Sequence, residues 1–428
     1  MKWRNELIAL FCLLLFAALG VVYFQYWVIQ KPFGIILFVG EGLTPVQIAL
    51  TRLYVGGADA HLGFESLEHV AIVKNHSEDF AVPDSAAAAT AIATGVKVPN
   101  RAIAVNAEGK PVQSIVDLAR EHGRMAGLVT NGKLTDATSA AFYAHAAAGT
   151  DGDANAIAQQ LVENGKWDVV MGGGAALFLP STKGGERQDA RDLLLELRRN
   201  GFDLVRTRAE LESVSSTRRP RLFGVFANHE LAFADQIEEQ REQPSLSDMV
   251  RRAIELLQYN RGGYFLAVDA ALGRKAAEEN RAERTLNQTA ELDRALTTAR
   301  RYAGARSTIV VCGDVAVGGL ALNGFPFRND SGIALLGLNS TGEPWMSWAS
   351  GPKGIRSFSD AKHFTNGQPA QRATEKPLTE ELEPAAFYSQ LGLNTAADMI
   401  ALGSGRGTAA LHGYIDNTQI FRMLRDEL

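Results

Sequence analysis

The chain has 428 residues, and its 43 basic side chains against 48 acidic ones give a formal charge of −5. This balance excludes a typical nucleic-acid-binding protein, which carries a basic excess to neutralise phosphates. With 21% charged and 46% hydrophobic residues, the composition is that of a folded globular protein, with one large domain or two to three smaller ones. Two cysteines and eight histidines exclude a disulfide framework and a cysteine-based zinc site. A zinc site in this chain would need histidines and carboxylates.

The N-terminal segment, residues 1–30, has the pattern of a membrane anchor. An uncharged run from Leu7 to Phe24 is about as long as a bilayer core is thick. Trp27 would lie in the interface, and Lys2 and Arg4 favour a cytoplasmic N-terminus, which places the rest of the chain on the periplasmic or extracellular side. A cleaved signal peptide and a secreted chain are the alternative, but cleavage at the Ala-Leu-Gly sequence would leave VVYFQYWVI exposed.

The rest of the chain alternates between apolar runs and amphipathic patterns. The apolar runs predict strands at 33–40, 126–130, 167–173, 263–268 and 307–313. The amphipathic patterns predict helices at 112–123, 155–165, 190–201 and 246–260, and Thr44-Pro45 is a plausible helix start. Strands separated by such helices indicate an α/β fold, a three-layer sandwich whose mainly parallel central sheet is flanked by helices. We expect one domain over 31–428, with an insertion rich in Gly, Pro, Ser and Asn at about 318–392.

Four of the predicted strands run into an acidic residue at or soon after their carboxyl ends. These residues are Glu41, Asp136, Asp269 and Asp314. Ligands of open parallel sheets bind beyond the carboxyl ends of the strands. Converging carboxylates repel one another and normally need a cation, although any single Asp here is also a common helix cap. The set predicts a site for a hard cation.

A second motif is Asp84-Ser85 followed by AAAATAIATG. Asp84 can cap an alanine-rich helix that ends at Gly95. Ser85 would then lie in the first turn, where free N–H groups and the helix dipole favour a phosphate group. Taken alone, the motif is more typical of a capped structural helix than of a catalytic serine.

Several segments together resemble the alkaline phosphatase family. ILFVGEGLTPVQ, VPDSAAAATAIATGVK, LVTNGKLTDATSAAFYAH, GYFLAVD, IVVCGD and LHGYIDNTQIF occur in the order expected for that family, between about Gly34 and the C-terminus. The resemblance implies a parallel sheet between helix layers. It also implies hydrolysis of phosphate monoesters through a phosphoserine, with two zinc ions and one magnesium ion. The family's nucleophile matches Ser85.

The family's magnesium-ligand positions are matched, but Glu stands where the family has Asp, and Asp stands where it has Glu. The positions that the resemblance assigns to the magnesium ligands are Glu41, Thr138 and Asp269, with Asp136 as an outer-shell carboxylate. An all-oxygen set of this kind remains suitable for Mg²⁺.

The zinc and phosphate positions are mostly substituted. Asp314 is retained, but the positions implied for the other zinc ligands hold Val315, Arg274, Glu278 and Asn394, with Ser340 as a less favoured match for the last. The arginine that would clamp the substrate phosphate falls at Gly149. No histidine matches a ligand position, and His363, within the predicted insertion, would need a rearranged loop to reach the site. Zinc, expected from the family, is therefore not supported by these residues.

Arg274 has two interpretations. Its guanidinium could supply positive charge at a former zinc position, or it could form a surface ion pair with Glu278 four residues along a helix.

Three functions remain open at this stage. The first is a membrane-anchored family member with weakened or lost phosphatase activity that still binds phosphate or phosphate esters. The second is an active phosphoryl-transfer enzyme that uses Ser85 and one Mg²⁺. The third is a membrane-anchored binding or scaffold protein whose insertion contacts a partner.

Overall fold

The computed structural model describes residues 2–23, 31–147, 153–324, 336–338, 342, 344–355 and 382–428. The helices are α1 (Lys2–Tyr23), α2 (Pro45–Gly56), α3 (Ser85–Thr94), α4 (Ile115–Glu121), α5 (Ala137–Ala140), α6 (Ala154–Glu163), α7 (Leu193–Arg199), α8 (Arg208–Ser213), α9 (Leu246–Leu257), α10 (Leu272–Glu278), α11 (Ala282–Tyr302) and α12 (Thr418–Arg425). The strands are β1 (Gly34–Gly40), β2 (His69–Lys74), β3 (Met125–Lys133), β4 (Val169–Gly173), β5 (Asp203–Val205), β6 (Leu222–Val225), β7 (Tyr264–Ala270), β8 (Thr308–Gly313), β9 (Ala316–Val317), β10 (Ala321–Leu322), β11 (Met346–Gly351), β12 (Ala385–Tyr388), β13 (Asn394–Thr395), β14 (Met399–Ser404) and β15 (His412–Asp416).

A ten-stranded sheet forms the centre of the molecule, in the order β15-β2-β14-β8-β1-β7-β3-β4-β6-β5. Only β14 among these strands runs antiparallel to its neighbours, β2 and β8. The mainly parallel sheet predicted from the alternating pattern is therefore confirmed. Its five predicted strands correspond to β1, β3, β4, β7 and β8.

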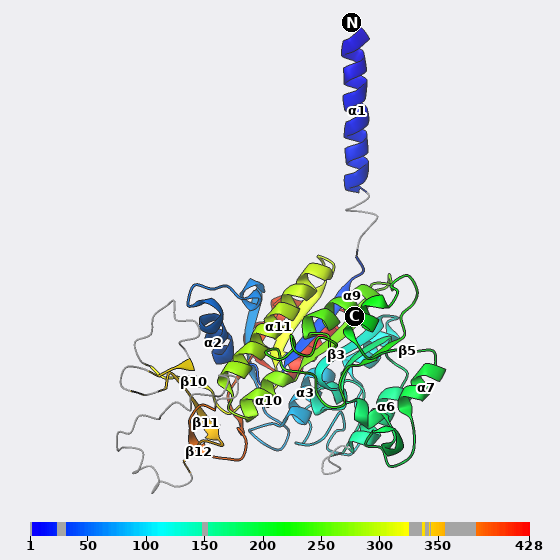
Figure 1. Ribbon diagram of the computed structural model, residues 1–428. Helices are drawn as coiled ribbons and strands as arrows, with labels where there is room; N and C mark the ends of the chain where they lie inside the picture. The colour runs from blue at the N-terminus through cyan, green and yellow to red at the C-terminus, as the bar shows by residue number, and fades with distance from the viewer. Residues whose placement is uncertain are drawn as a thin grey trace.

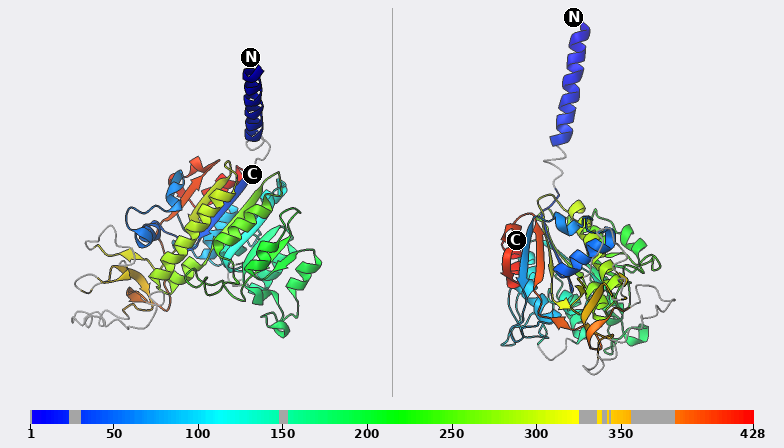
Figure 2. Two further views of the ribbon diagram at one scale, coloured as in Figure 1. Left: turned by 45° about the horizontal axis from the view of Figure 1, so that its top comes forward. Right: turned by 90° about the vertical axis from the view of Figure 1, so that its left-hand side faces the viewer.

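Helices cover both faces of this sheet, as the continuous apolar strands require. In β1, Ile35 and Leu37 face one core, which α3, α4, α6, α7 and α12 complete. Ile36 and Phe38 face the other core, with α2, α8, α9 and α11. Figures 1 and 2 show α9 and α11 lying side by side across this second face. The predicted three-layer sandwich is confirmed.

The helix α11 is absent from the predicted elements, and its buried side explains why. That side carries Arg284, Gln288 and Glu291, all less than 9% exposed. Arg284 pairs with Asp235 at 2.8 Å. These buried polar side chains interrupt the apolar stripe from which helices are recognised.

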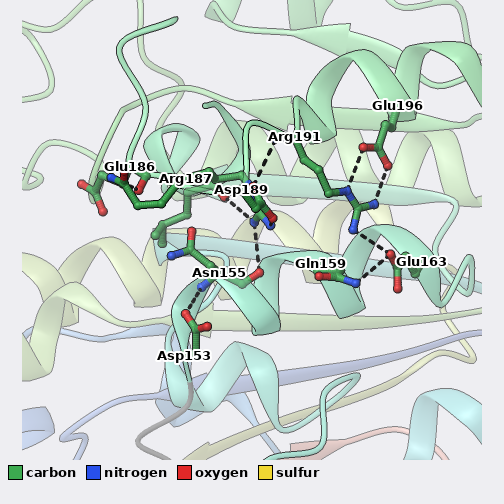
Figure 3. Close-up of polar contacts among 11 residues, drawn as sticks. Asp153, Asn155, Gln159, Glu163, Glu186, Arg187, Asp189, Arg191 and Glu196 are labelled. Atoms are coloured by element: carbon green, nitrogen blue, oxygen red, sulfur yellow. Dashed lines mark hydrogen bonds and ion pairs between the residues drawn. The ribbon is translucent and has the colours of Figure 1, made fainter. Parts of the chain in front are cut away.

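A polar network ties α6 to the segment before α7 (Figure 3). The buried guanidinium of Arg187 donates to Asp189 and to the main-chain oxygen of Asn155, each at 3.0 Å. Arg191 pairs with both Glu196 (2.7 Å) and Glu163 (3.0 Å). These contacts hold α6 at the rim of the cavity described below.

The described parts of 318–392 form a small sheet of β10, β11 and β12 beside the main body. Trp348 and Met346 of β11 pack with Leu50 of α2 and Leu286 of α11. The boundaries of the insertion remain a prediction, and 325–335 and 356–381 within it lie outside the described residues.

Among the described helices, α1 is the one long and apolar enough to cross a bilayer. Its window Trp3–Val21 makes no buried contact with the rest of the chain (Figure 1). A helix of this kind near an N-terminus is typical of a signal anchor and of a signal peptide alike. Trp27, placed in the interface by the sequence, lies outside the described residues.

Candidate active site

A cavity of about 540 Å³ opens at the edge of the sheet where the parallel strands end. Five of the residues predicted from the sequence line it, namely Glu41, Ser85, Asp136, Arg274 and Glu278. Asp269 at the end of β7 and Asp314 after β8 are buried at the same edge. The parallel register of β1 with β7 and β8 brings these acids together.

Ser85 lies at the first position of α3, as the sequence predicts. Asp84 caps the helix and accepts a hydrogen bond from the Ala87 amide at 2.8 Å. Gly95 ends it in the left-handed conformation, with φ of 72°. The half-buried Ser85 Oγ donates to Asp314 Oδ2 at 2.8 Å and accepts from Arg274 Nη1 at 2.5 Å. The serine therefore lies between a carboxylate and a guanidinium.

Arg274 on α10 contacts two other residues, Glu278 and Asn394, that the sequence interpretation assigns with it to substituted zinc positions. Its Nε donates to Glu278 Oε1 at 2.8 Å, and its Nη2 donates to Asn394 Oδ1 at 3.3 Å. Glu41 lies 4.0 Å from Nε. Burial acts to lower the pKa of Arg274, but Glu278, Glu41 and Asp314 outweigh it and raise that pKa. The ion pair with Glu278 is present, yet the contact with Ser85 places Arg274 in the site rather than on a plain surface.

Asp314 holds Ser85 from the other side. Its Oδ1 accepts from the Gly42 amide at 2.9 Å, and its Oδ2 accepts from Ser85. Burial raises the pKa of Asp314, and Arg274 partly opposes that rise. The next residue, Val315, is fully buried and offers no ligand atom.

The oxygen ligands proposed for magnesium form a second, buried group. Asp269 Oδ2 accepts from Ser139 Oγ at 2.7 Å and from Thr130 Oγ1 at 3.1 Å. Asp269 Oδ1 and Thr138 Oγ1 are buried without a hydrogen-bond partner among the described residues. Buried polar atoms are normally satisfied, so these two oxygens fit a site that binds a further group.

The pKa values of the two carboxyl groups in this second group are also perturbed. Burial raises the pKa of Asp269 to about 7. Burial, together with repulsion from Asp269 and Asp314, raises the pKa of Glu41 well above its ordinary value. Such raised values are typical of acids brought together where a cation would neutralise them.

Asp136 lies at the start of α5 and lines the cavity. Its Oδ2 accepts from the Lys133 amide at 2.9 Å, and the Lys133 ammonium is 3.7 Å from Oδ1. Burial raises its pKa, and Lys133 opposes that rise. These contacts are compatible with the outer-shell role that the sequence assigns to it.

Within the described residues, no group of three or more His, Cys, Asp or Glu side chains has the arrangement of a metal site. The oxygen set above includes a threonine, so that finding does not test it. Three positions from the sequence interpretation, Gly149, Ser340 and His363, lie outside the described residues.

Sequence reasoning missed several residues of the site. Thr130 and Ser139 hold Asp269, and Arg101 and Lys275 line the cavity. Ser139 directly follows Thr138, so its place near the site could have been predicted from Thr138. Arg101 could not, because only the loop between α3 and α4 brings it back to the cavity.

The cavity thus lies at the carboxyl ends of the parallel strands, with a serine at the start of a buried helix in its lining. A family model described as alkaline phosphatase matches residues 34–428, and the chain belongs to this family. The family resemblance inferred from the motifs is confirmed.

Known relatives agree with this assignment. The chain is 30% identical to alkaline phosphatase H of Pseudomonas aeruginosa (strain UCBPP-PA14), over 67% of this chain and 70% of that protein. It is 30% identical to the tissue-nonspecific alkaline phosphatase of Gallus gallus, over 65% of this chain and 62% of the relative. The matched region thus spans less than two thirds of the avian protein.

Solved structures show the fold. The alkaline phosphatase of Thermus thermophilus superposes with a TM-score of 0.71 at 24% identity, over 93% of this chain and 92% of that one. The alkaline phosphatase of the Antarctic bacterium TAB5 superposes with a TM-score of 0.68 at 21% identity, over 93% of this chain and 98% of that one.

Proposed function

We propose that this chain is a phosphate monoester hydrolase of reduced activity, in which Arg274 stands beside Ser85 in place of zinc. One observation carries the proposal: the Ser85 hydroxyl lies within hydrogen-bond reach of both the Asp314 carboxylate and the Arg274 guanidinium. A nucleophile held between a base and a cation is the arrangement that activated serines need.

The reaction that this arrangement supports begins with attack of Ser85 Oγ on phosphorus. The Oγ–P bond forms, the bond from phosphorus to the leaving oxygen breaks, and the hydroxyl proton passes to Asp314. Because burial raises the pKa of Asp314, its carboxylate accepts a proton more readily than an exposed aspartate does. Water then attacks the phosphorus, the Oγ–P bond breaks, and Asp314 returns the proton to Ser85 Oγ as phosphate is released.

Positive charge around the phosphate would come from three sources. Arg274 reaches Ser85 directly, Arg101 lines the same cavity, and Ser85 lies at the N-terminus of α3, the positive end of the helix dipole. No zinc-type ligand occupies the Arg274, Asn394 or Val315 position, so the leaving oxygen lacks the stabilisation zinc supplies. An aryl phosphate, whose phenolate leaves without protonation, should therefore react fastest.

Magnesium fits the second group of oxygens. Glu41, Thr138 and Asp269 would hold it, and the two unpartnered oxygens of Thr138 and Asp269 support this assignment. The bound ion would neutralise the buried carboxylates next to Ser85. A solved structure of a TAB5 alkaline phosphatase mutant has Mg bound in its M3 site. Zinc is not part of the proposal.

The expected activity is low. Losing one donor aimed at the transition state lowers a rate by about 100- to 1000-fold, and losing a metal costs more. We place the domain on the extracytoplasmic side of a membrane through α1, with secretion after signal cleavage as the alternative.

The test is hydrolysis of an aryl phosphate by the full chain in detergent, beside Ser85→Ala. We expect slow turnover that disappears in Ser85→Ala, with phosphate trapped on Ser85 and detected by peptide mass spectrometry. Ser181→Ala, in an exposed turn away from the cavity, is the matched control. Phosphate binding with equal background rates in all three proteins would instead favour the binding or scaffold function, and stoichiometric zinc with Ser85-dependent turnover would overturn the zinc-free site.

A further inference from the structure

The edge of the sheet opposite the cavity is the one at which the chain arrives from α1. The first residues of β1, β3, β7 and β8 lie there, as their parallel register requires. Seven residues, 24–30, separate α1 from Lys31, and seven residues span at most about 25 Å. Figure 1 shows the start of β1 and the C-terminus at this end, with α3 and α10 at the far end. A membrane that holds α1 would therefore face this edge.

The loops at this edge are rich in arginine. The segments 217–221, 259–263 and 301–307 precede β6, β7 and β8, and 404–407 follows β14 where Ser404 pairs with Ile309. These four segments read TRRPR, YNRGG, RYAGARS and SGRG, with seven arginines and no Asp or Glu. The whole chain has a net charge of −5, so positive charge is concentrated here against the overall balance.

Acidic side chains also reach this edge, and Asp203, Asp168 and Glu427 are paired with arginines of these loops. Asp168 contacts Arg219 at 3.1 Å, and Glu427 contacts Arg406 at 3.2 Å. Asp168 also pairs with Arg120 at 2.5 Å. The four loops hold more basic side chains than these acidic partners, because they contain seven arginines and no acidic residue.

A second cavity, of about 340 Å³, lies within this edge. Arg120, Arg124 and Arg219 line it together with Tyr259 and Asn260. Arg124 is 8% exposed, and its Nη1 has no hydrogen-bond partner among the described residues. Its Nη2 donates to the Glu427 and Leu428 oxygens at 2.8 Å and 3.1 Å, which leaves Nη1 as the unpartnered donor. Burial, and to a smaller extent the nearby Arg406, lowers the pKa of Arg124, and Glu427 opposes that shift. A buried donor of this kind fits an anionic oxygen.

We propose that this edge is a docking face for the anionic headgroups of the bilayer in which α1 is embedded, with a lipid phosphate entering the cavity at Arg124. The short connection to α1 and the spread of arginines over four loops match a charged plane rather than one small anion. Docking would turn the Ser85 cavity toward the water. The proposal needs α1 as a retained anchor but does not depend on catalysis.

The test uses the full chain in lipid nanodiscs, either neutral phosphatidylcholine or phosphatidylcholine with about a third phosphatidylglycerol. Amide hydrogen exchange is followed by mass spectrometry. We expect exchange in 217–221 and 259–263 to be at least about threefold slower in the anionic discs, and this protection to vanish at about 0.5 M salt, where charges are screened.

Two charge variants separate docking from a general effect of charge. Arg219→Gln/Arg261→Gln should lose the protection, and Arg261→Gln alone should weaken it, which guards against misfolding of the double variant. Lys74→Gln/Lys183→Gln removes the same charge at the last residue of β2 and in the 3-10 helix Ser181–Lys183 beyond β4, and should keep the protection.

Equal exchange in the two kinds of disc would overturn the docking face. The same protection in neutral discs with inorganic phosphate would also overturn it, as a site for free anions. Failure of the full chain to enter discs would overturn the anchor, whereas aryl phosphate turnover would still report on the proposed catalytic function.

Discussion

The two halves of the active-site cavity differ in what lies beside their buried carboxyl groups. In one half, the cation belongs to the chain: Arg274 lies among Glu278, Asn394 and Ser85. In the other half, Asp269 and Thr138 present buried oxygens that no described donor satisfies. We call these the arginine half and the oxygen half. In the arginine half, a side chain of the protein lies among the carboxylates, whereas the oxygen half keeps two unpartnered buried oxygens, for which we propose a bound cation.

Under the proposed function, this difference shows what would change when a side chain takes the place of a metal ion. A guanidinium neutralises neighbouring carboxylates and orients a hydroxyl, but it cannot accept the leaving oxygen as a ligand in the way zinc does. The arginine half can therefore position Ser85 and bind phosphate while the rate of bond cleavage stays low. The following predictions test whether the halves differ in this way.

The largest effect is expected for Arg274→Ala. Removing the guanidinium leaves Glu41, Glu278 and Asp314 facing one another and Ser85 without its cation. We expect kcat/KM for an aryl phosphate to fall by about 1000-fold, equivalent to about 4 kcal/mol. Arg274→Lys keeps the charge but loses the planar fork, so its loss should be smaller, about 10- to 100-fold.

Arg284→Ala is the matched control for this prediction. Arg284 is also buried and paired, with Asp235 at 2.8 Å, but it does not line the cavity. It should lower the unfolding temperature without a selective loss of kcat/KM. Equal activity losses in the two alanine variants would show that Arg274 acts only through stability, and the comparison of the two halves would fail.

The second prediction concerns the oxygen half and added metal. Mg²⁺ at about 100 times its dissociation constant should stabilise the fold by about 2.7 kcal/mol, measured as a higher unfolding temperature in calorimetry. Thr138→Val should weaken Mg²⁺ binding at least about tenfold, because it removes an oxygen ligand without changing the side chain's size.

Thr289→Val is the control for that experiment, since the Thr289 hydroxyl is buried on α11 and already donates to the Thr285 main-chain oxygen at 2.9 Å. It should lower stability but leave the response to Mg²⁺ intact. An unfolding temperature that does not respond to Mg²⁺ in the unmodified chain would remove the distinction between the two halves.

The two halves also differ in how far sequence predicts them. The acids Glu41, Asp269 and Asp314 could be placed together in advance, because parallel strands end at one edge and each acid follows a buried apolar run. The contact between Arg274 and Ser85 could not, because it joins α10 to α3 across 189 positions and depends on side-chain direction. The same limit applies to the fold. Its buried central strands were predicted, whereas β15, with three exposed residues of five, was not.

A third prediction uses a reference carboxyl group far from both halves in sequence. Glu383 accepts from the Ala282 amide at 2.7 Å, and burial raises its pKa from 4.5 to about 7. Because the folded state favours the protonated form, the stabilisation is complete below about pH 4.5 and is lost as the pH rises through 7.

The size of this effect should be on the order of 2 kcal/mol between pH 4.5 and 8, seen by denaturant unfolding. Glu383→Gln, which stays neutral, should remove that part of the pH dependence, and Mg²⁺ should not change it. A contribution of Glu383 that disappears on adding Mg²⁺ would mean that the metal acts outside the oxygen half.

The smallest effect is expected for Arg101, which would extend the arginine half across the cavity. Arg101 has a φ of 69°, a left-handed conformation that glycine adopts without strain, and its amide donates to Asp84 at 2.6 Å. Arg101→Gly therefore removes the guanidinium while relieving the backbone. We expect the dissociation constant of inorganic phosphate, measured by calorimetric titration, to rise about tenfold, or about 1.4 kcal/mol, with no loss of thermal stability. Arg101→Lys should keep most of the affinity for phosphate. Unchanged phosphate binding in Arg101→Gly would show that Arg101 does not belong to the arginine half.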